Sequence, residues 1–130
     1  MKAGKSQTIS SRFLLVIWIL SIAAVSYLSL TPKIEFPLDF EKADLMYHSI
    51  AYLWIAAMPF FAFQREKTGL VSALLMMVLG VALEVTQIAI PSRVFSALDI
   101  GANGVGVIMG ILCAKLVRSG LFRSSGAITE

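Results

Sequence analysis

The chain has 130 residues, of which 58% are hydrophobic and 15% are charged, and its mean hydropathy is +0.83. A water-soluble fold of this length cannot hide so much apolar surface, so these values exclude a soluble globular domain. The net charge of +3 is spread along the chain, which argues against nucleic acid as a partner. The single cysteine, Cys113, excludes an intrachain disulfide and a cysteine-based metal site.

Four apolar blocks, separated by charged stretches, predict an all-α, polytopic membrane protein built as a four-transmembrane-helix bundle. The first block runs from Phe13 to Leu30. We interpret it as an uncleaved transmembrane helix, because it is longer than a typical signal-peptide core and no clear cleavage site follows it before Pro32. The expected division is an N-terminal cytoplasmic segment (1–12), a transmembrane domain (13–118) and a flexible cytoplasmic tail (119–130).

Three further helices are expected along the chain. Pro59 should kink the far end of the second helix, a distortion that transmembrane helices tolerate. The expected ranges are from about Lys42–Asp44 to Phe63, from about Gly69 to Ile90, and from between Phe95 and Asp99 to about Val117.

The distribution of Lys and Arg predicts the topology. With a cytoplasmic N-terminus, eight of these residues lie on the inner side and three on the outer side, so both termini are expected in the cytoplasm. The inner residues are Lys2, Lys5, Arg12, Arg65, Lys67, Lys115, Arg118 and Arg123, and the outer ones are Lys33, Lys42 and Arg93.

Polar residues are expected to meet at the outer end of this bundle. Such residues are costly in a membrane, so helices that carry them usually turn them towards the bundle interior or a polar cavity. The expected ligand-binding residues are Asp44, His48 and Tyr52 on the second helix, Glu84 and Gln87 on the third, Arg93 in the Pro91–Arg93 loop, and Asp99 and Asn103 on the fourth.

Several roles remain open for these groups. His48 suits acid–base chemistry, with Asp44 one turn earlier to orient it, and Glu84 is a second candidate base. Alternatively, Glu84 only joins helices by a hydrogen bond to His48 or Asn103, worth roughly 0.6 to 2 kcal/mol. A metal would need Glu84 and Asp99 beside His48, and no metal-binding motif is present, so we predict neither a metal nor a cofactor.

Two further features have both structural and functional interpretations. Arg93 is either an interfacial cation that meets lipid headgroups or a fork donor to a phosphate or carboxylate of a ligand. Gly106 and Gly110 have the spacing that allows another helix to approach closely, which we expect to serve packing within the chain.

The ordered series of motifs resembles that of the VanZ-like family of small bacterial membrane proteins. The family often has Lys directly after the aspartate, where this chain has Leu45, and Lys42 lies one turn earlier. The resemblance implies a place in the bacterial cell envelope and a link to glycopeptide resistance of the teicoplanin type. It rests on Ser29-Leu-Thr-Pro32, Asp44-Leu-Met-Tyr-His48-x-x-x-Tyr52, Glu84-x-x-Gln87, Pro91-Ser92-Arg93 and Asp99-x-x-x-Asn103-x-x-Gly106-x-x-x-Gly110.

Three hypotheses of function follow. The first is a multi-pass protein of the bacterial plasma membrane whose outward-facing pocket binds an envelope amphiphile, such as a lipid headgroup, a lipid-linked saccharide or a lipidated glycopeptide. The second is a membrane enzyme that acts on a lipid-linked substrate, with His48 or Glu84 as acid or base. The third is a structural subunit of an envelope assembly, with a membrane protein as its partner.

Overall fold

The computed structural model describes residues 3–32, 37 and 42–126, with side chains for 10–32, 37 and 42–120. Every regular element in these ranges is a helix. Lys2, Lys33 and the last four residues of the predicted tail lie outside the described residues. The helices are α1 (Ala3–Leu30), α2 (Ala43–Ala57), α3 (Pro59–Ala62), α4 (Glu66–Gln87) and α5 (Ala97–Gly126).

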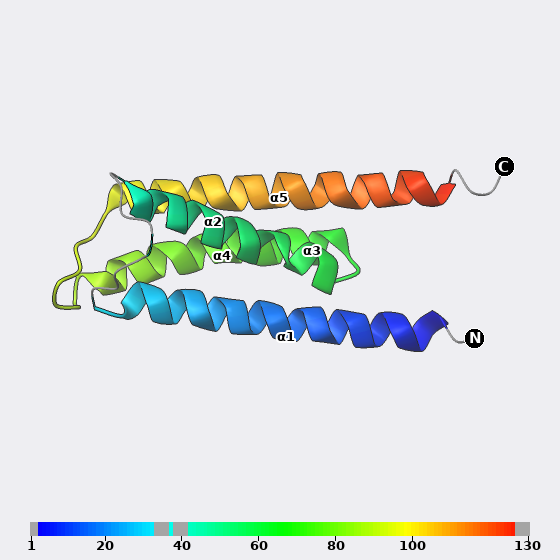
Figure 1. Ribbon diagram of the computed structural model, residues 1–130, viewed down its shortest axis with the longest axis horizontal. Helices are drawn as coiled ribbons and strands as arrows, with labels where there is room; N and C mark the ends of the chain where they lie inside the picture. The colour runs from blue at the N-terminus through cyan, green and yellow to red at the C-terminus, as the bar shows by residue number, and fades with distance from the viewer. Residues whose placement is uncertain (1–2, 33–36, 38–41, 127–130) are drawn as a thin grey trace.

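The helices run side by side along the long axis of the molecule, with α2 and α4 drawn between α1 and α5 (Figure 1). The start of α1 and the end of α5 lie at the same end of the bundle (Figure 1). Four segments are long and apolar enough to cross a membrane, which confirms the predicted number of spans. They are Ser10–Leu30, Ala43–Ala62, Glu66–Gln87 and Ala97–Gly120.

Pro59 interrupts the second span, as predicted. The chain forms two helices, α2 and α3, which meet at Met58, and Pro59 occupies the first turn of α3. Proline suits that position because the first N–H groups of a helix have no partner inside the helix. The backbone N–H groups of Phe61 and Ala62 donate to Met58 O at 3.0 Å, so the break needs only a local rearrangement.

Three helix ends agree with the predicted ones: α1 ends at Leu30, α2 begins at Ala43 and α5 begins at Ala97. Other ends differ. At its start, α4 gains a turn in which Glu66 stands at the positive end of the helix dipole. At its other end, tighter bonds such as Ile90 N–H to Gln87 O replace the α-helical pattern before Ile90. The last helix continues to Gly126, past the expected end near Val117, because no proline interrupts this stretch.

Helices α2 and α5 form the most extensive contact in the bundle. A Cβ atom on Gly106 would collide with the carbonyl oxygen of Ser49, and one on Gly110 would collide with that of Leu53. The two backbones therefore meet directly, which confirms that this pair of glycines serves packing within the chain. The core around this contact consists of Tyr52, Ile55, Ala56, Phe60, Ala73, Met76, Val107 and Ala114.

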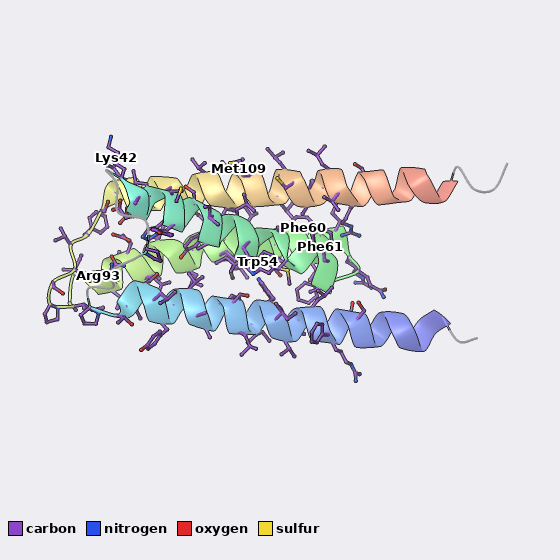
Figure 2. All side chains as sticks on the ribbon, in the orientation of Figure 1. Lys42, Trp54, Phe60, Phe61, Arg93 and Met109 are labelled. Atoms are coloured by element: carbon purple, nitrogen blue, oxygen red, sulfur yellow. The ribbon has the colours of Figure 1, made fainter. Side chains whose placement is uncertain are left out.

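Helix α1 is the most peripheral of the four long helices. None of its described side chains is fully buried, and many apolar ones project outwards from it, as they do from the other helices (Figure 2). One anchor is Trp18, whose Nε1–H donates to Ile55 O at 2.8 Å and whose ring meets Phe63 edge-on at 5.8 Å. The exposed apolar surface matches what lipid chains would cover.

Candidate functional site

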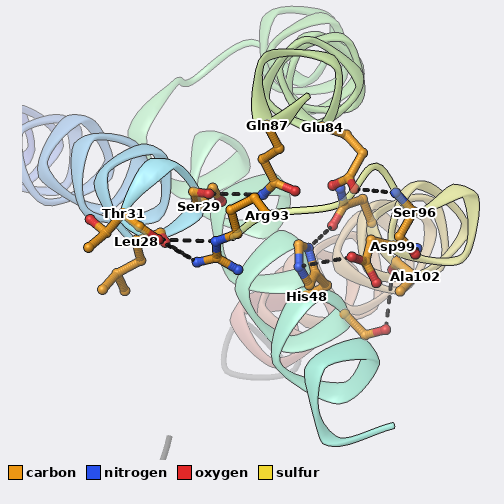
Figure 3. A network of polar contacts seen from close by, with 12 residues as sticks. Leu28, Ser29, Thr31, His48, Glu84, Gln87, Arg93, Ser96, Asp99 and Ala102 are labelled. Atoms are coloured by element: carbon orange, nitrogen blue, oxygen red, sulfur yellow. Dashed lines mark hydrogen bonds and ion pairs between the residues drawn. The ribbon is translucent and has the colours of Figure 1, made fainter. Parts of the chain in front are cut away.

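Five of the predicted polar residues are seen together at the end of the bundle where α1 and α4 end and α2 and α5 begin (Figure 3). They are His48, Glu84, Gln87, Arg93 and Asp99. Four polar or charged side chains are classed as buried there, and Glu84 and Asn103 are each only 1% exposed. Close packing makes this possible, because Gly80 leaves space where a Cβ would come within 3.0 Å of Asn103 Nδ2 and of the Tyr52 ring. The buried polar residues are Glu84, Gln87, Asp99 and Asn103.

His48 is held between two residues of α5. Its Nδ1 lies 2.9 Å from Asn103 Oδ1, and its Nε2 lies 3.8 Å from Asp99 Oδ2. An amide oxygen can only accept a hydrogen bond, so Nδ1 donates. Proton gain and loss by the ring are therefore directed to Nε2, which forms an ion pair with Asp99 when the ring is protonated.

Glu84 organises the start of α5. Its Oε1 accepts a hydrogen bond of 2.7 Å from the backbone N–H of Ser96. Ser96 Oγ in turn accepts from the backbone N–H of Asp99 at 3.2 Å, which is a helix-capping contact. Glu84 thus joins the end of α4 to the first turn of α5, and its bond goes to backbone and not to His48 or Asn103.

Arg93 closes the end of α1. Its Nε donates to Thr31 O at 3.1 Å, and its Nη2 donates to Thr31 O at 2.8 Å and to Leu28 O at 3.0 Å. Gln87 adds a fourth bond, from its Nε2 to Ser29 O at 2.9 Å. The last carbonyls of a helix lack partners within the helix, and a cation is favourable at that end. Arg93 and Gln87 therefore hold α1 against the rest of the bundle.

A cavity of about 170 Å³ opens between α1 and α2, and we call it the α1–α2 cavity. Val25 and Leu28 give it apolar walls on one side, and Ala51 and Tyr52 do so on the other. The polar side chains of the lining lie towards the end of the cavity where α1 ends and α2 begins. The full lining is Val25, Leu28, Ser29, Asp44, Tyr47, His48, Ala51, Tyr52 and Arg93.

A second, wider space of about 570 Å³ lies beneath the segment that joins α4 to α5, and we call it the loop cavity. Ser92 turns the chain here with a left-handed backbone (φ 68°). Asp44 and Arg93 line both cavities, so the two spaces adjoin at these side chains. The full lining is Asp44, Gln87, Ser92, Arg93, Val94, Phe95, Ser96, Ala97, Leu98 and Asp99.

Six of the eight predicted ligand-binding residues line a cavity. His48 and Tyr52 line the α1–α2 cavity, Gln87 and Asp99 line the loop cavity, and Asp44 and Arg93 line both. Glu84 and Asn103 line neither, although they belong to the same network. Asn103 accepts a hydrogen bond from His48 and Glu84 accepts one from Ser96, so both hold residues that line a cavity.

The expected partnership of Asp44 with His48 is not formed. His48 pairs with Asp99 and Asn103, whereas Asp44 makes no hydrogen bond or ion pair with any described residue. The physical reason is the close α2–α5 packing, which brings residues of α5 to the imidazole. Lys42 lies one turn before Leu45, and its side chain points away from the bundle (Figure 2).

Sequence reasoning missed several contributors to the site. Ser96 could have been found, because a serine three residues before an acidic residue at a helix start is a capping pattern. Leu28 and Thr31 contribute only backbone carbonyls, and no pattern of side chains announces that role. Tyr47 lines the α1–α2 cavity and gave no distinctive signal.

The described side chains include no group of three or more His, Cys, Asp and Glu residues placed to hold a metal ion. Comparisons with family models, curated proteins and solved structures give no match.

Proposed function

We propose that this protein binds an amphiphile of the cell envelope, with the polar headgroup in the loop cavity and an apolar chain in the α1–α2 cavity. The observation that carries the proposal is that these two cavities share Asp44 and Arg93 in their linings and so lie next to each other. One cavity has largely apolar walls beside a peripheral helix, and the other is bordered by charged and amide side chains.

Elementary energetics favour such a ligand. Each buried methylene of a chain contributes about 0.8 kcal/mol, while polar groups in the loop cavity fix the orientation. Membrane lipids are the partners available to a cavity between transmembrane helices. Because α1 covers the cavity from the outside without being buried itself, a chain can enter laterally beside it.

The proposal extends to the setting of the protein. In keeping with the resemblance to the VanZ-like family, the chain is a multi-pass protein of the bacterial plasma membrane with both termini in the cytoplasm. The ligand is then a lipid headgroup, a lipid-linked saccharide or a lipidated glycopeptide, and binding it contributes to glycopeptide resistance of the teicoplanin type.

Filling the α1–α2 cavity tests this function. Ala51→Phe places an aromatic ring in the cavity, while Ile50→Phe puts the same ring on the neighbouring, outward-facing position, where Ile50 is 56% exposed. Native mass spectrometry of gently purified protein should show lipid retained by wild type and Ile50→Phe, and at least about tenfold less by Ala51→Phe. Equal lipid retention by all three proteins would contradict the proposal.

A second candidate, acid–base catalysis on a lipid-linked substrate, is favoured by the geometry of His48. Asn103 fixes the ring, and Nε2 is left for proton transfer beside Asp99 in a side chain that lines a cavity. This candidate requires turnover by purified protein with a bell-shaped pH profile that His48→Gln abolishes. Binding without turnover would leave the first proposal alone.

A further inference from the structure

The loop cavity is lined by two carboxyl groups with oxygens that lack hydrogen-bond donors within the part of the chain that the structure describes. Asp99 is 8% exposed, and its Oδ1 is buried without a hydrogen-bond partner among the described residues. Asp44 lines the same cavity and also lacks such a partner. Ionised carboxylates only accept hydrogen bonds, so a ligand that satisfies them must bring N–H or O–H donors.

Arg93, in contrast, has donor groups that require an acceptor on the ligand. Its Nε and Nη2 are engaged with the carbonyls of Leu28 and Thr31, while Nη1 donates to no described residue. Arg93 borders both cavities, where the headgroup of a ligand would join its apolar chain. A guanidinium group in this position suits a phosphate, with which it forms charge-assisted hydrogen bonds.

The charges decide what else the headgroup must carry. Among the described residues, this end of the bundle carries the carboxyl groups of Asp44, Glu84 and Asp99. The positive groups there are Arg93, His48 when protonated, and Lys42, whose side chain points away from the bundle (Figure 2). A headgroup with a phosphate alone would meet Arg93 favourably and the carboxylates unfavourably. A primary ammonium on the same headgroup removes that conflict, and its three N–H donors can reach both unpartnered acids.

We infer that the bound amphiphile carries a primary ammonium beside its phosphate, as in a phosphoethanolamine headgroup. The phosphate would meet Arg93, and the ammonium would lie between Asp44 and Asp99. This inference rests on the proposed amphiphile binding and narrows it to one class of headgroup. It excludes two common alternatives, since a glycerol headgroup has donors without positive charge and a quaternary ammonium has charge without N–H donors.

Headgroup methylation tests the inference on the unaltered protein. The delipidated full chain is titrated in detergent with short-chain lipids that share their acyl chains, and binding is followed by native mass spectrometry. The series runs from phosphatidylethanolamine through its mono- and dimethyl forms to phosphatidylcholine, with phosphatidylglycerol alongside. Affinity should fall at each methylation and by at least about tenfold overall, with phosphatidylglycerol also at least about tenfold weaker.

Two outcomes separate this inference from the proposed function. Equal affinity for all these lipids overturns the ammonium assignment and leaves amphiphile binding standing. Absence of binding by all of them overturns the inference, and the proposed function fails with it if the gently purified wild-type protein also retains no amphiphile. Free phosphoethanolamine, which lacks acyl chains, should bind more weakly than the lipid; equal binding would mean that the α1–α2 cavity holds no chain.

A variant pair localises the effect. Asp99→Asn removes one carboxylate with little change of shape and should abolish the preference for phosphatidylethanolamine over phosphatidylglycerol. Glu66 forms an ion pair with Lys115 at the opposite end of the bundle, with 3.1 Å between Glu66 Oε1 and Lys115 Nζ. Glu66→Gln removes the same charge as Asp99→Asn, but far from the site, and should keep the preference. Circular dichroism verifies that both variants remain helical, and an unchanged preference in folded Asp99→Asn would overturn the assignment.

Discussion

The acidic residues of the site differ in what they contact. Glu84 holds the structure together, whereas Asp99 is placed to meet a ligand. Glu84 is almost completely buried, lines neither cavity and accepts from the backbone of Ser96. Asp99 borders the loop cavity and keeps a buried oxygen without a partner. Replacing Glu84 should therefore alter stability first, whereas replacing Asp99 should alter ligand preference first.

The stability of Glu84 variants tests this division. Glu84→Ala leaves the Ser96 N–H without its acceptor and should lower the free energy of unfolding by about 1 to 3 kcal/mol. Glu84→Gln keeps an acceptor oxygen in the same position and should lose less. Chemical denaturation in detergent micelles, followed by circular dichroism, measures both. A full loss of lipid preference in a stable Glu84→Ala protein would instead make Glu84 part of the ligand site.

The sequence predicted which polar residues gather but not how they pair. Helical spacing placed Asp44 and His48 on one face, yet the imidazole turns to Asp99 and Asn103, because α5 packs directly against α2. Arg93 was expected to meet lipid or ligand, and the structure shows it donating to the backbone carbonyls of Leu28 and Thr31. Backbone groups look alike at every position, so sequence patterns cannot announce such partners.

At the scale of elements, hydrophobicity predicted the number of spans and Pro59 predicted the break between α2 and α3. The ends of the helices were less predictable. They depend on local partners, such as Glu66 in the first turn of α4 and the tighter turns that follow Gln87. Such local hydrogen bonds set the exact residue at which a helix begins or ends, and the apolar pattern of a span does not reveal them.

The glycines of α5 offer a test at this scale. Gly106→Ala forces a methyl group against the backbone of α2 and should destabilise the bundle by about 1 to 3 kcal/mol, as overpacking does. Gly101→Ala is the matched control, because nothing lies within 4 Å of its added methyl group and alanine favours the helix. Thermal unfolding of both proteins in micelles should show opposite shifts, and equal shifts would refute the direct backbone contact.

At the scale of the whole molecule, the side of the membrane on which the site opens can be measured. In a Cys113→Ala background, Ser92→Cys marks the loop beside the site, and Ser119→Cys marks the far end of α5; both serines are exposed. With the predicted topology, a membrane-impermeant maleimide should label Ser92→Cys in intact cells and label Ser119→Cys only after permeabilisation. The reverse pattern would open the site to the cytoplasm.

The bonds from Arg93 to α1 have a consequence for the order in which the protein is made. The carbonyls that end α1 receive their donors from a residue 62 positions later than Thr31, in the segment that follows the third span. During synthesis these carbonyls therefore cannot receive the bonds from Arg93 until the segment that follows α4 has been made. The side chain that lies between the two cavities is thus supplied by a segment made after the third span.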